Sequence, residues 1–193
     1  MRIISGIFKG TKLYGPESKK IRPLKDMVKE SIFNFLNHSN KIQLQLKNSN
    51  ILDLYSGTGS FGLEFISREA QQVFFIEKEK EAVEILKKNI NKLKGTNKSK
   101  VYFNDVIDIF KKKFFPWSSD LKFDVIFCDP PFKESNVDEL LELITKKSIL
   151  KKNGIIILHR HKNSNDQLIN YLNVIDERIY GLSKITFAQA KIL

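Results

Sequence analysis

The sequence predicts an α/β fold in which a mainly parallel sheet carries helices on both faces. Short apolar runs alternate with longer amphipathic segments from residue 51 to residue 158, and two of these runs end in motifs typical of ligand-binding loops. Right-handed crossovers would bring the carboxyl ends of the strands to one edge, where such sheets bind ligands. The chain has 193 residues and is 41% hydrophobic, which is enough for one compact unit with a sizeable core.

The N-terminal part predicts a small appendage in front of this sheet. Residues 2–5 and 11–14 are expected to form a β-hairpin, with glycines near the turn. A helix should follow, because apolar residues recur there at helical spacing on one face. These residues are Val28, Ile32, Phe35 and Leu36. A polar stretch then separates an appendage over residues 1–46 from a larger unit over residues 47–193.

The elements of the larger unit follow in order. Strands are expected over residues 51–54, 73–76, 101–103, 123–128 and 154–158. Helices are expected from about residue 60, over 78–94 and over 137–145, with a helical or loop segment after the third strand. The tail reads as two further strands, over residues 174–180 and 184–192, around Gly181.

A glycine-rich turn follows the first strand of this unit. Gly57, Gly59 and Gly62 satisfy the pattern G-x-G-x-x-G, and Glu77 ends the next apolar run about twenty residues later, the spacing of a ribose-binding acid. Glycine tolerates φ > 0 and leaves room for a ligand, and the N-terminus of the next helix offers free N–H groups. The motif therefore predicts a nucleoside cofactor. Asp53 at the strand end favours one with a positive charge, such as S-adenosylmethionine, over the pyrophosphate of NAD.

A second motif, D-P-P-F, follows the strand at residues 123–128. Two prolines forbid continuation of the strand, so Asp129 and Phe132 are expected on a stiff turn at its carboxyl end. A planar aromatic amine needs an acceptor for its N–H groups and a ring to stack on its base, and this turn offers both. The motif alone is equally compatible with an ordinary Pro-Pro turn after a buried strand.

Together, in this order and spacing, these motifs resemble those of the Rossmann-like class I S-adenosylmethionine-dependent methyltransferases. The N-terminal block narrows the resemblance, because residues 2–13 and 22–34 are similar to the RsmD family of bacterial 16S rRNA guanine-N2 methyltransferases. The resemblance spans nearly the whole chain and implies a seven-stranded, mostly parallel sheet behind an RNA-binding hairpin and helix. Two positions depart from it, since Leu24 stands where the family usually has Thr and Met27 where it usually has Arg.

The resemblance implies methyl transfer from S-adenosylmethionine to the exocyclic N2 of a guanine. The residues implied at the cofactor are Asp53, Ser56, Gly57, Thr58, Gly59, Glu77, Lys78, Asp105 and Val106. The residues implied at the reacting amine are Asp129, Pro130, Pro131 and Phe132. In this scheme Asp129 and the Pro130 carbonyl accept the amine protons, and Phe132 stacks on a base that has left its helix.

The basic charge of the chain is concentrated near its N-terminus. The net charge is +11, and the first 30 residues hold eight basic and three acidic groups. Such a local excess indicates a polyanion partner, here ribosomal RNA or the small ribosomal subunit. The candidate RNA-binding residues are Arg2, Lys9, Lys12, Arg22, Lys25 and Lys29. The abundance of Lys, Ile and Asn also matches the codon bias of an AT-rich genome, which would explain the charge without RNA.

Other functions stay open on the sequence alone. Related motifs serve adenine-N6 and protein-glutamine methyltransferases, and a nicotinamide-dependent oxidoreductase shares the glycine pattern. A noncatalytic RNA-binding assembly factor would need only the basic N-terminus. No run approaches the roughly 18 apolar residues of a membrane span, and no signal-peptide core is present, so a cytoplasmic monomer is expected.

The H-R-H-K sequence at residues 159–162 lacks a third metal ligand nearby, and no metal is expected. An alternative role for Arg160 and Lys162 is contact with phosphate.

Overall fold

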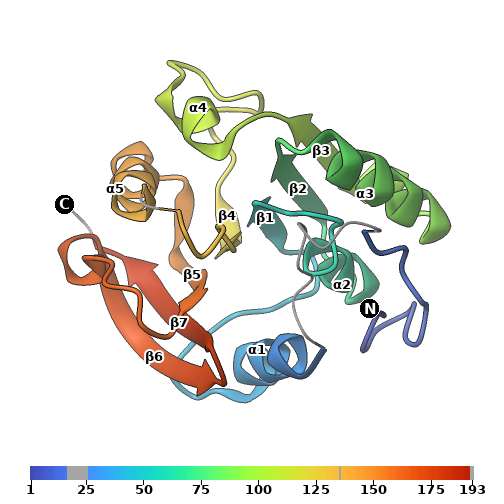
Figure 1. Ribbon diagram of the computed structural model, residues 1–193, viewed down its shortest axis with the longest axis horizontal. Helices are drawn as coiled ribbons and strands as arrows, with labels where there is room; N and C mark the ends of the chain where they lie inside the picture. Colours follow the sequence, from blue (N-terminus) through green and yellow to red (C-terminus); the bar gives the residue numbers. More distant parts are fainter. Residues whose placement is uncertain (17–25, 135, 192–193) are drawn as a thin grey trace.

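The computed structural model describes residues 1–16, 26–134 and 136–191 (Figure 1). The strands are β1 (Asn50–Leu54), β2 (Gln72–Glu77), β3 (Ser99–Phe103), β4 (Phe123–Cys128), β5 (Leu150–His161), β6 (Leu172–Tyr180) and β7 (Ser183–Ala190). The α-helices are α1 (Asp26–His38), α2 (Gly62–Ser67), α3 (Lys80–Lys92), α4 (Val106–Lys111) and α5 (Val137–Lys147). Two short 3-10 helices are η1 (Thr96–Lys98) and η2 (Leu168–Asn170).

Seven strands form one sheet in the order β3-β2-β1-β4-β5-β7-β6. β1 to β5 are parallel, and β7 lies antiparallel between β5 and β6. The predicted Rossmann-like α/β fold, including the two-stranded antiparallel end, is therefore confirmed. β5 is longer than expected, because it begins at Leu150 and pairs with β4 through a register shift between Phe123 and Val125.

The central strands are apolar on both faces, because helices cover both sides of the sheet. Alternate side chains such as Phe75 and Phe127 share one core with α1, α2 and α3. The intervening side chains, such as Phe74 and Ile126, share a second core with α4 and α5. Figure 1 shows these two groups of helices on opposite sides of the strands.

The order of the strands reverses between β1 and β4, which fixes the position of the ligand crevice. In open α/β sheets, ligands bind beyond the carboxyl ends of the strands at this switch point. The glycine-rich loop leaves β1 there, and the D-P-P-F turn leaves β4 there. The backbone N–H of Asp129 donates to the carbonyl of Leu54 at 3.4 Å, so the two motifs lie directly beside each other.

The predicted N-terminal hairpin is reduced to a single antiparallel bridge between Arg2 and Lys12. Residues 2–5 and 11–14 do not form strands, because α2 takes up part of their backbone hydrogen bonding. The buried carboxylate of Glu64 accepts from the N–H groups of Ile4 and Ser5 at 2.8 and 2.9 Å. The two segments still pair antiparallel, since the N–H groups of Ile3 and Leu13 donate to the carbonyls of Thr11 and Met1 at 3.0 and 3.2 Å. The predicted hairpin is therefore present in reduced form, without two full strands, and is also anchored by side chains of a neighbouring helix.

Helix α1 follows the prediction from its apolar face, which packs on the sheet side occupied by α2. The rings of Phe35 and Phe187 stack with centroids 4.0 Å apart, and those of Phe33 and Phe65 lie 4.8 Å apart. The core thus continues from α1 into the larger unit, while the division after residue 46 stays a prediction. Within the described part of the chain, the helices are too short or too polar to cross a bilayer.

Candidate active site at the carboxyl edge of the sheet

The glycine-rich loop after β1 has a backbone that requires glycine. Gly57 and Gly59 have φ values of 54° and 82°. A Cβ on Gly59 would lie 2.2 Å from the side chain of Leu86, and one on Gly62 would lie 2.3 Å from the ring of Phe75. The loop can therefore turn tightly and bring the N-terminus of α2 close to the end of β1.

Asp53 lies inside this turn and is almost fully buried. One carboxylate oxygen, Oδ2, accepts from the N–H of Gly62 at 2.9 Å. The other oxygen, Oδ1, is buried without a hydrogen-bond partner among the described residues. Burial raises the pKa of Asp53 well above its ordinary value, and the N–H of Gly62 only partly offsets this. An orphaned acceptor of this kind suits a cationic ligand.

Glu77 ends β2 and is held by three backbone N–H groups. Its Oε2 accepts from Gly57 at 2.7 Å, and its Oε1 accepts from Lys78 and Glu79 at 2.8 Å each. A carboxylate has about four acceptor positions, so it retains capacity for a ligand hydroxyl. Glu77 thus also fastens the glycine-rich loop, a second role that the sequence did not reveal.

Asp105 is the N-cap of α4. Its Oδ1 accepts from the N–H of Ile107 at 2.8 Å, and its Oδ2 pairs with the ammonium of Lys78 at 3.0 Å. Burial raises the pKa of Asp105, but the Lys78 bond and the N–H groups of Asp108 and Ile107 outweigh it, so the pKa lies below its ordinary value. Both carboxylate oxygens are therefore already engaged, while the neighbouring Val106 is buried.

The other two predicted cofactor residues of the loop differ in accessibility. Ser56 is half-buried, and its hydroxyl donates to the carbonyl of Ile76 at 3.3 Å. Thr58 is buried, and its carbonyl accepts from the side-chain amide of Asn89 at 3.0 Å. Thr58 therefore supports the loop from within, and Ser56 lies closer to solvent.

The D-P-P-F turn brings an acid and a ring to the same edge, as the sequence predicted. Asp129 and Phe132 are half-buried, whereas Pro130 is buried and Pro131 is exposed. Oδ1 of Asp129 lies 2.7 Å from Nδ1 of His159. Phe132 packs against the same imidazole in an edge-to-face arrangement, with centroids 5.4 Å apart.

Comparison with known proteins identifies the family. Residues 1–189 match the model of a family described as Conserved hypothetical protein 95. The ribosomal RNA small subunit methyltransferase D of Haemophilus influenzae is 34% identical over 84% of this chain and 80% of its own length. The protein of the same name from Escherichia coli is 30% identical over 81% of this chain and 72% of its own length.

The chain belongs to the RsmD family of methyltransferases. A solved structure from Haemophilus influenzae, described as a methylase, superposes with a TM-score of 0.75 at 29% identity, and the match covers 97% of each chain. A structure from Escherichia coli superposes with a TM-score of 0.81 at 24% identity over 100% of this chain and 99% of its own, which shows the shared fold.

In this RsmD-family chain, the end of β5 supplies residues that the sequence reading missed. Arg160 is buried, and its guanidinium donates to the carbonyls of Pro131 and Glu134 at 3.2 and 2.8 Å. It also pairs with Asp166 at 3.0 Å. Arg160 therefore clamps the turn after the motif, and its interpretation as a phosphate contact is wrong. No signal in the sequence points to this contact, because it depends on the register in which β4 and β5 pair.

The candidate RNA-binding residues of the RsmD-family N-terminus fall into three groups. Arg2, Lys9 and Lys12 are exposed, and Arg2 lies 3.5 Å from Asp26. Arg22 and Lys25 lie outside the described residues. The prediction that Lys29 binds RNA is wrong, because its side chain is fully buried and cannot reach a partner.

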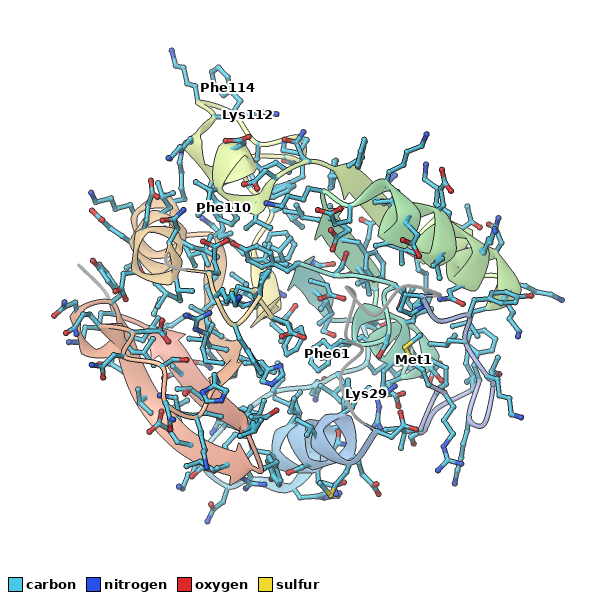
Figure 2. The ribbon with its side chains drawn as sticks, in the orientation of Figure 1. Met1, Lys29, Phe61, Phe110, Lys112 and Phe114 are labelled. Carbon is cyan, nitrogen blue, oxygen red and sulfur yellow. The ribbon has the colours of Figure 1, made fainter. Side chains whose placement is uncertain are left out.

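The ammonium of Lys29 donates to the carbonyl of Arg2 at 2.7 Å and lies 3.7 Å from Glu64. Figure 2 shows Lys29 pointing from α1 toward Phe61, with Met1 nearby. The local sequence around Lys29 could not show that a buried acid lies beside its side chain. Its role is to neutralise Glu64.

Proposed function

We propose that this RsmD-family methyltransferase transfers a methyl group from S-adenosylmethionine to the exocyclic N2 amine of a guanine in 16S ribosomal RNA. The observation that carries the proposal is the position of Asp129 and Phe132 at the switch point, directly beside the glycine-rich loop. Ribosomal RNA as substrate is supported by relatives named ribosomal RNA small subunit methyltransferase D.

The residues after β1 and β2 fit S-adenosylmethionine. The cofactor supplies a methyl group activated on a positively charged sulfonium. The orphaned Oδ1 of Asp53 offers a buried acceptor for positive charge, and Glu77 is held at the strand end where ribose hydroxyls are expected. Ser56, Lys78 and the Gly57–Gly59 turn would complete the cradle. Asp105 and Val106 would border the adenine. The main contribution of Asp105 would be to cap the N-terminus of α4 and so hold Val106 in place.

The residues after β4 would prepare the amine for attack. The lone pair of a guanine N2 is conjugated with its ring, so the amine must be turned until this pair faces the methyl carbon. We infer that Asp129 and the carbonyl of Pro130 accept the two N–H groups and hold that orientation, at about 3–3.5 Å from the methyl group. Phe132 would stack on the flipped base, while Pro130 and Pro131 keep the turn rigid.

The substrate is tested by nucleoside mass spectrometry of 16S rRNA from a strain that lacks the gene. We expect N2-methylguanosine at one position to disappear, to return with the wild-type gene, and to stay absent with Asp129→Ala. Loss of N6-methyladenosine instead would identify the adenine-N6 alternative. Unchanged rRNA would exclude an rRNA substrate.

The cofactor is tested by calorimetry of the purified protein with S-adenosylmethionine and, separately, with NADH. We expect binding of S-adenosylmethionine only. Binding of NADH alone would favour the oxidoreductase that shares the glycine pattern.

A further inference from the structure

His159 lies behind the proposed amine-binding residues and touches both of them. Its Nδ1 is 2.7 Å from Oδ1 of Asp129, and its ring meets the ring of Phe132 at 84° with centroids 5.4 Å apart. The His159 side chain is 9% exposed, so it is covered by the protein and is not a surface group. The β4–β5 pairing of Cys128 with Leu158 produces this contact, because the next residue of each strand projects from the same edge.

The other ring nitrogen decides which tautomer is present. Nε2 of His159 is buried, and no acceptor lies within hydrogen-bond distance in the part of the chain that is described. A proton on Nε2 would therefore be a buried donor without a partner, which is unfavourable. A proton on Nδ1 has the carboxylate of Asp129 as its acceptor. The neutral Nδ1–H tautomer is thus the form that fits the site.

We propose that His159 is a positioning residue for methyl transfer, which donates from Nδ1 to Oδ1 of Asp129 and fixes the plane of that carboxylate. Oδ2 is then left to accept an N–H of the substrate amine. The inference rests on the proposed role of Asp129. The same imidazole packs against Phe132, as does that of His161 with centroids also 5.4 Å apart, so His159 contacts both the acceptor for the amine and the ring that stacks on the base. His159 takes no proton from the substrate in this scheme, since its free nitrogen is buried.

Two substitutions separate the hydrogen bond from the packing. His159→Phe keeps a ring against Phe132 but removes the donor, whereas His159→Asn removes the ring but keeps an N–H at the same bond count from the backbone as Nδ1. We expect His159→Phe to slow single-turnover methylation roughly 10- to 100-fold, the effect of losing one hydrogen bond to a charged group. His159→Asn should recover most of that rate. The affinity for S-adenosylmethionine, measured by calorimetry, should stay within about twofold in both variants, since neither touches the cradle.

A His159→Phe variant as fast as the wild type would overturn the inference. An equal loss in both variants would also overturn it, because packing and not donation would then matter. A loss of cofactor binding in parallel with the rate would assign His159 to the architecture of the fold instead.

The tautomer can be measured without any substrate. In long-range ¹⁵N–¹H spectra of the imidazoles, we expect His159 to show a protonated Nδ1 and an unprotonated Nε2. The chain has three histidines, and the signal missing in His159→Phe identifies the one that matters. A proton on Nε2 would overturn the inference whether or not the enzyme is active. Conversely, a wild-type protein that methylates no rRNA guanine would reject the proposed function and leave the tautomer result standing.

Discussion

Lys29 and Glu64 form an ion pair with nitrogen and oxygen 3.7 Å apart, and both side chains are fully buried. Glu64 also accepts from Arg68 at 3.0 Å and from two backbone N–H groups of the N-terminal segment. Burial lowers the pKa of Lys29, and Glu64 opposes that shift. The pair therefore joins α1, α2 and the first residues of the chain at one point.

Removing one partner of this pair should be costly. We expect Lys29→Ala to lower the free energy of unfolding by about 3–5 kcal/mol, because it leaves Glu64 buried with less compensation. The exposed Lys9→Ala is the matched control and should change it by no more than about 0.5 kcal/mol. Urea denaturation followed by circular dichroism measures both. Equal stability of the two variants would contradict the assignment.

Asp53 should make stability depend on pH. Its pKa in the folded protein lies well above the 3.8 of a free side chain, so its stabilising contribution is complete below about pH 3.8 and is lost as pH rises through the folded value. Asp53→Asn does not titrate. We expect the variant to gain stability relative to wild type with rising pH in that window, with a slope of up to about 1.4 kcal/mol per pH unit. Denaturation at several pH values gives the difference, and a constant difference would show that Asp53 is not perturbed.

Substitutions of Glu77 and Asp129 should affect different steps, cofactor binding and methyl transfer respectively. Glu77→Ala removes the partner proposed for the ribose hydroxyls and should weaken binding of S-adenosylmethionine by roughly 1–3 kcal/mol. Asp129→Ala should abolish methylation and leave cofactor affinity within a few-fold. Calorimetry of both variants with S-adenosylmethionine tests whether Glu77 and not Asp129 binds the cofactor. A large affinity loss in the Asp129 variant would place that residue at the cofactor instead.

Arg160 should affect the rate of methylation through the turn that it clamps. Arg160→Ala frees the carbonyls of Pro131 and Glu134 and leaves Asp166 without its buried partner. We expect a loss of stability of about 3–5 kcal/mol and a slower transfer step. Lys162→Ala, two residues away and exposed, is the control and should match wild type. An Arg160 variant with wild-type turnover would show that the turn is rigid without the clamp.

The exposed N-terminal lysines should contribute to RNA binding. Replacing Lys9 and Lys12 with Ala should weaken binding and flatten the log–log dependence on salt by roughly 0.7–0.9 for each lost phosphate contact. The matched control is the pair Lys100→Ala and Lys152→Ala, which are exposed near the amino ends of β3 and β5. Filter binding of 16S rRNA at several salt concentrations compares the two. Identical slopes would place the RNA surface elsewhere.

The sequence predicted the sheet and the positions of the two loops at its carboxyl edge, because these depend on local patterns. Apolar runs define buried strands, and the glycines and prolines specify turns with few alternatives. Its family resemblance was confirmed by a match over residues 1–189.

The failures concern contacts between distant segments. The basic N-terminus led to the prediction that Lys29 binds RNA. Its actual partner, Glu64, is 35 positions away in the chain, and no local pattern reveals such a pair. The N-terminal hairpin is shorter than predicted, because the N–H groups of Ile4 and Ser5 bind the carboxylate of Glu64. The sequence predicts no metal at His159 and no other role for it, because its neighbour Asp129 follows another strand. Strand register, which the sequence leaves open, decides all such pairs across the sheet.

The attachment of the N-terminal segment to α2 has a consequence for substrate selection. Ile4 and Ser5 are bound by the carboxylate of Glu64, and a Cβ on Gly6 would lie only 2.0 Å from the carbonyl of Ser67, so the backbone there fits without slack. Helix α2 in turn begins at the glycine-rich loop. If Lys9 and Lys12 hold the RNA and the glycine-rich loop holds the methyl donor, as proposed, this attachment fixes the distance between the two. In that case, the stretch of RNA between the phosphates held by these lysines and the target guanine has to match this fixed distance.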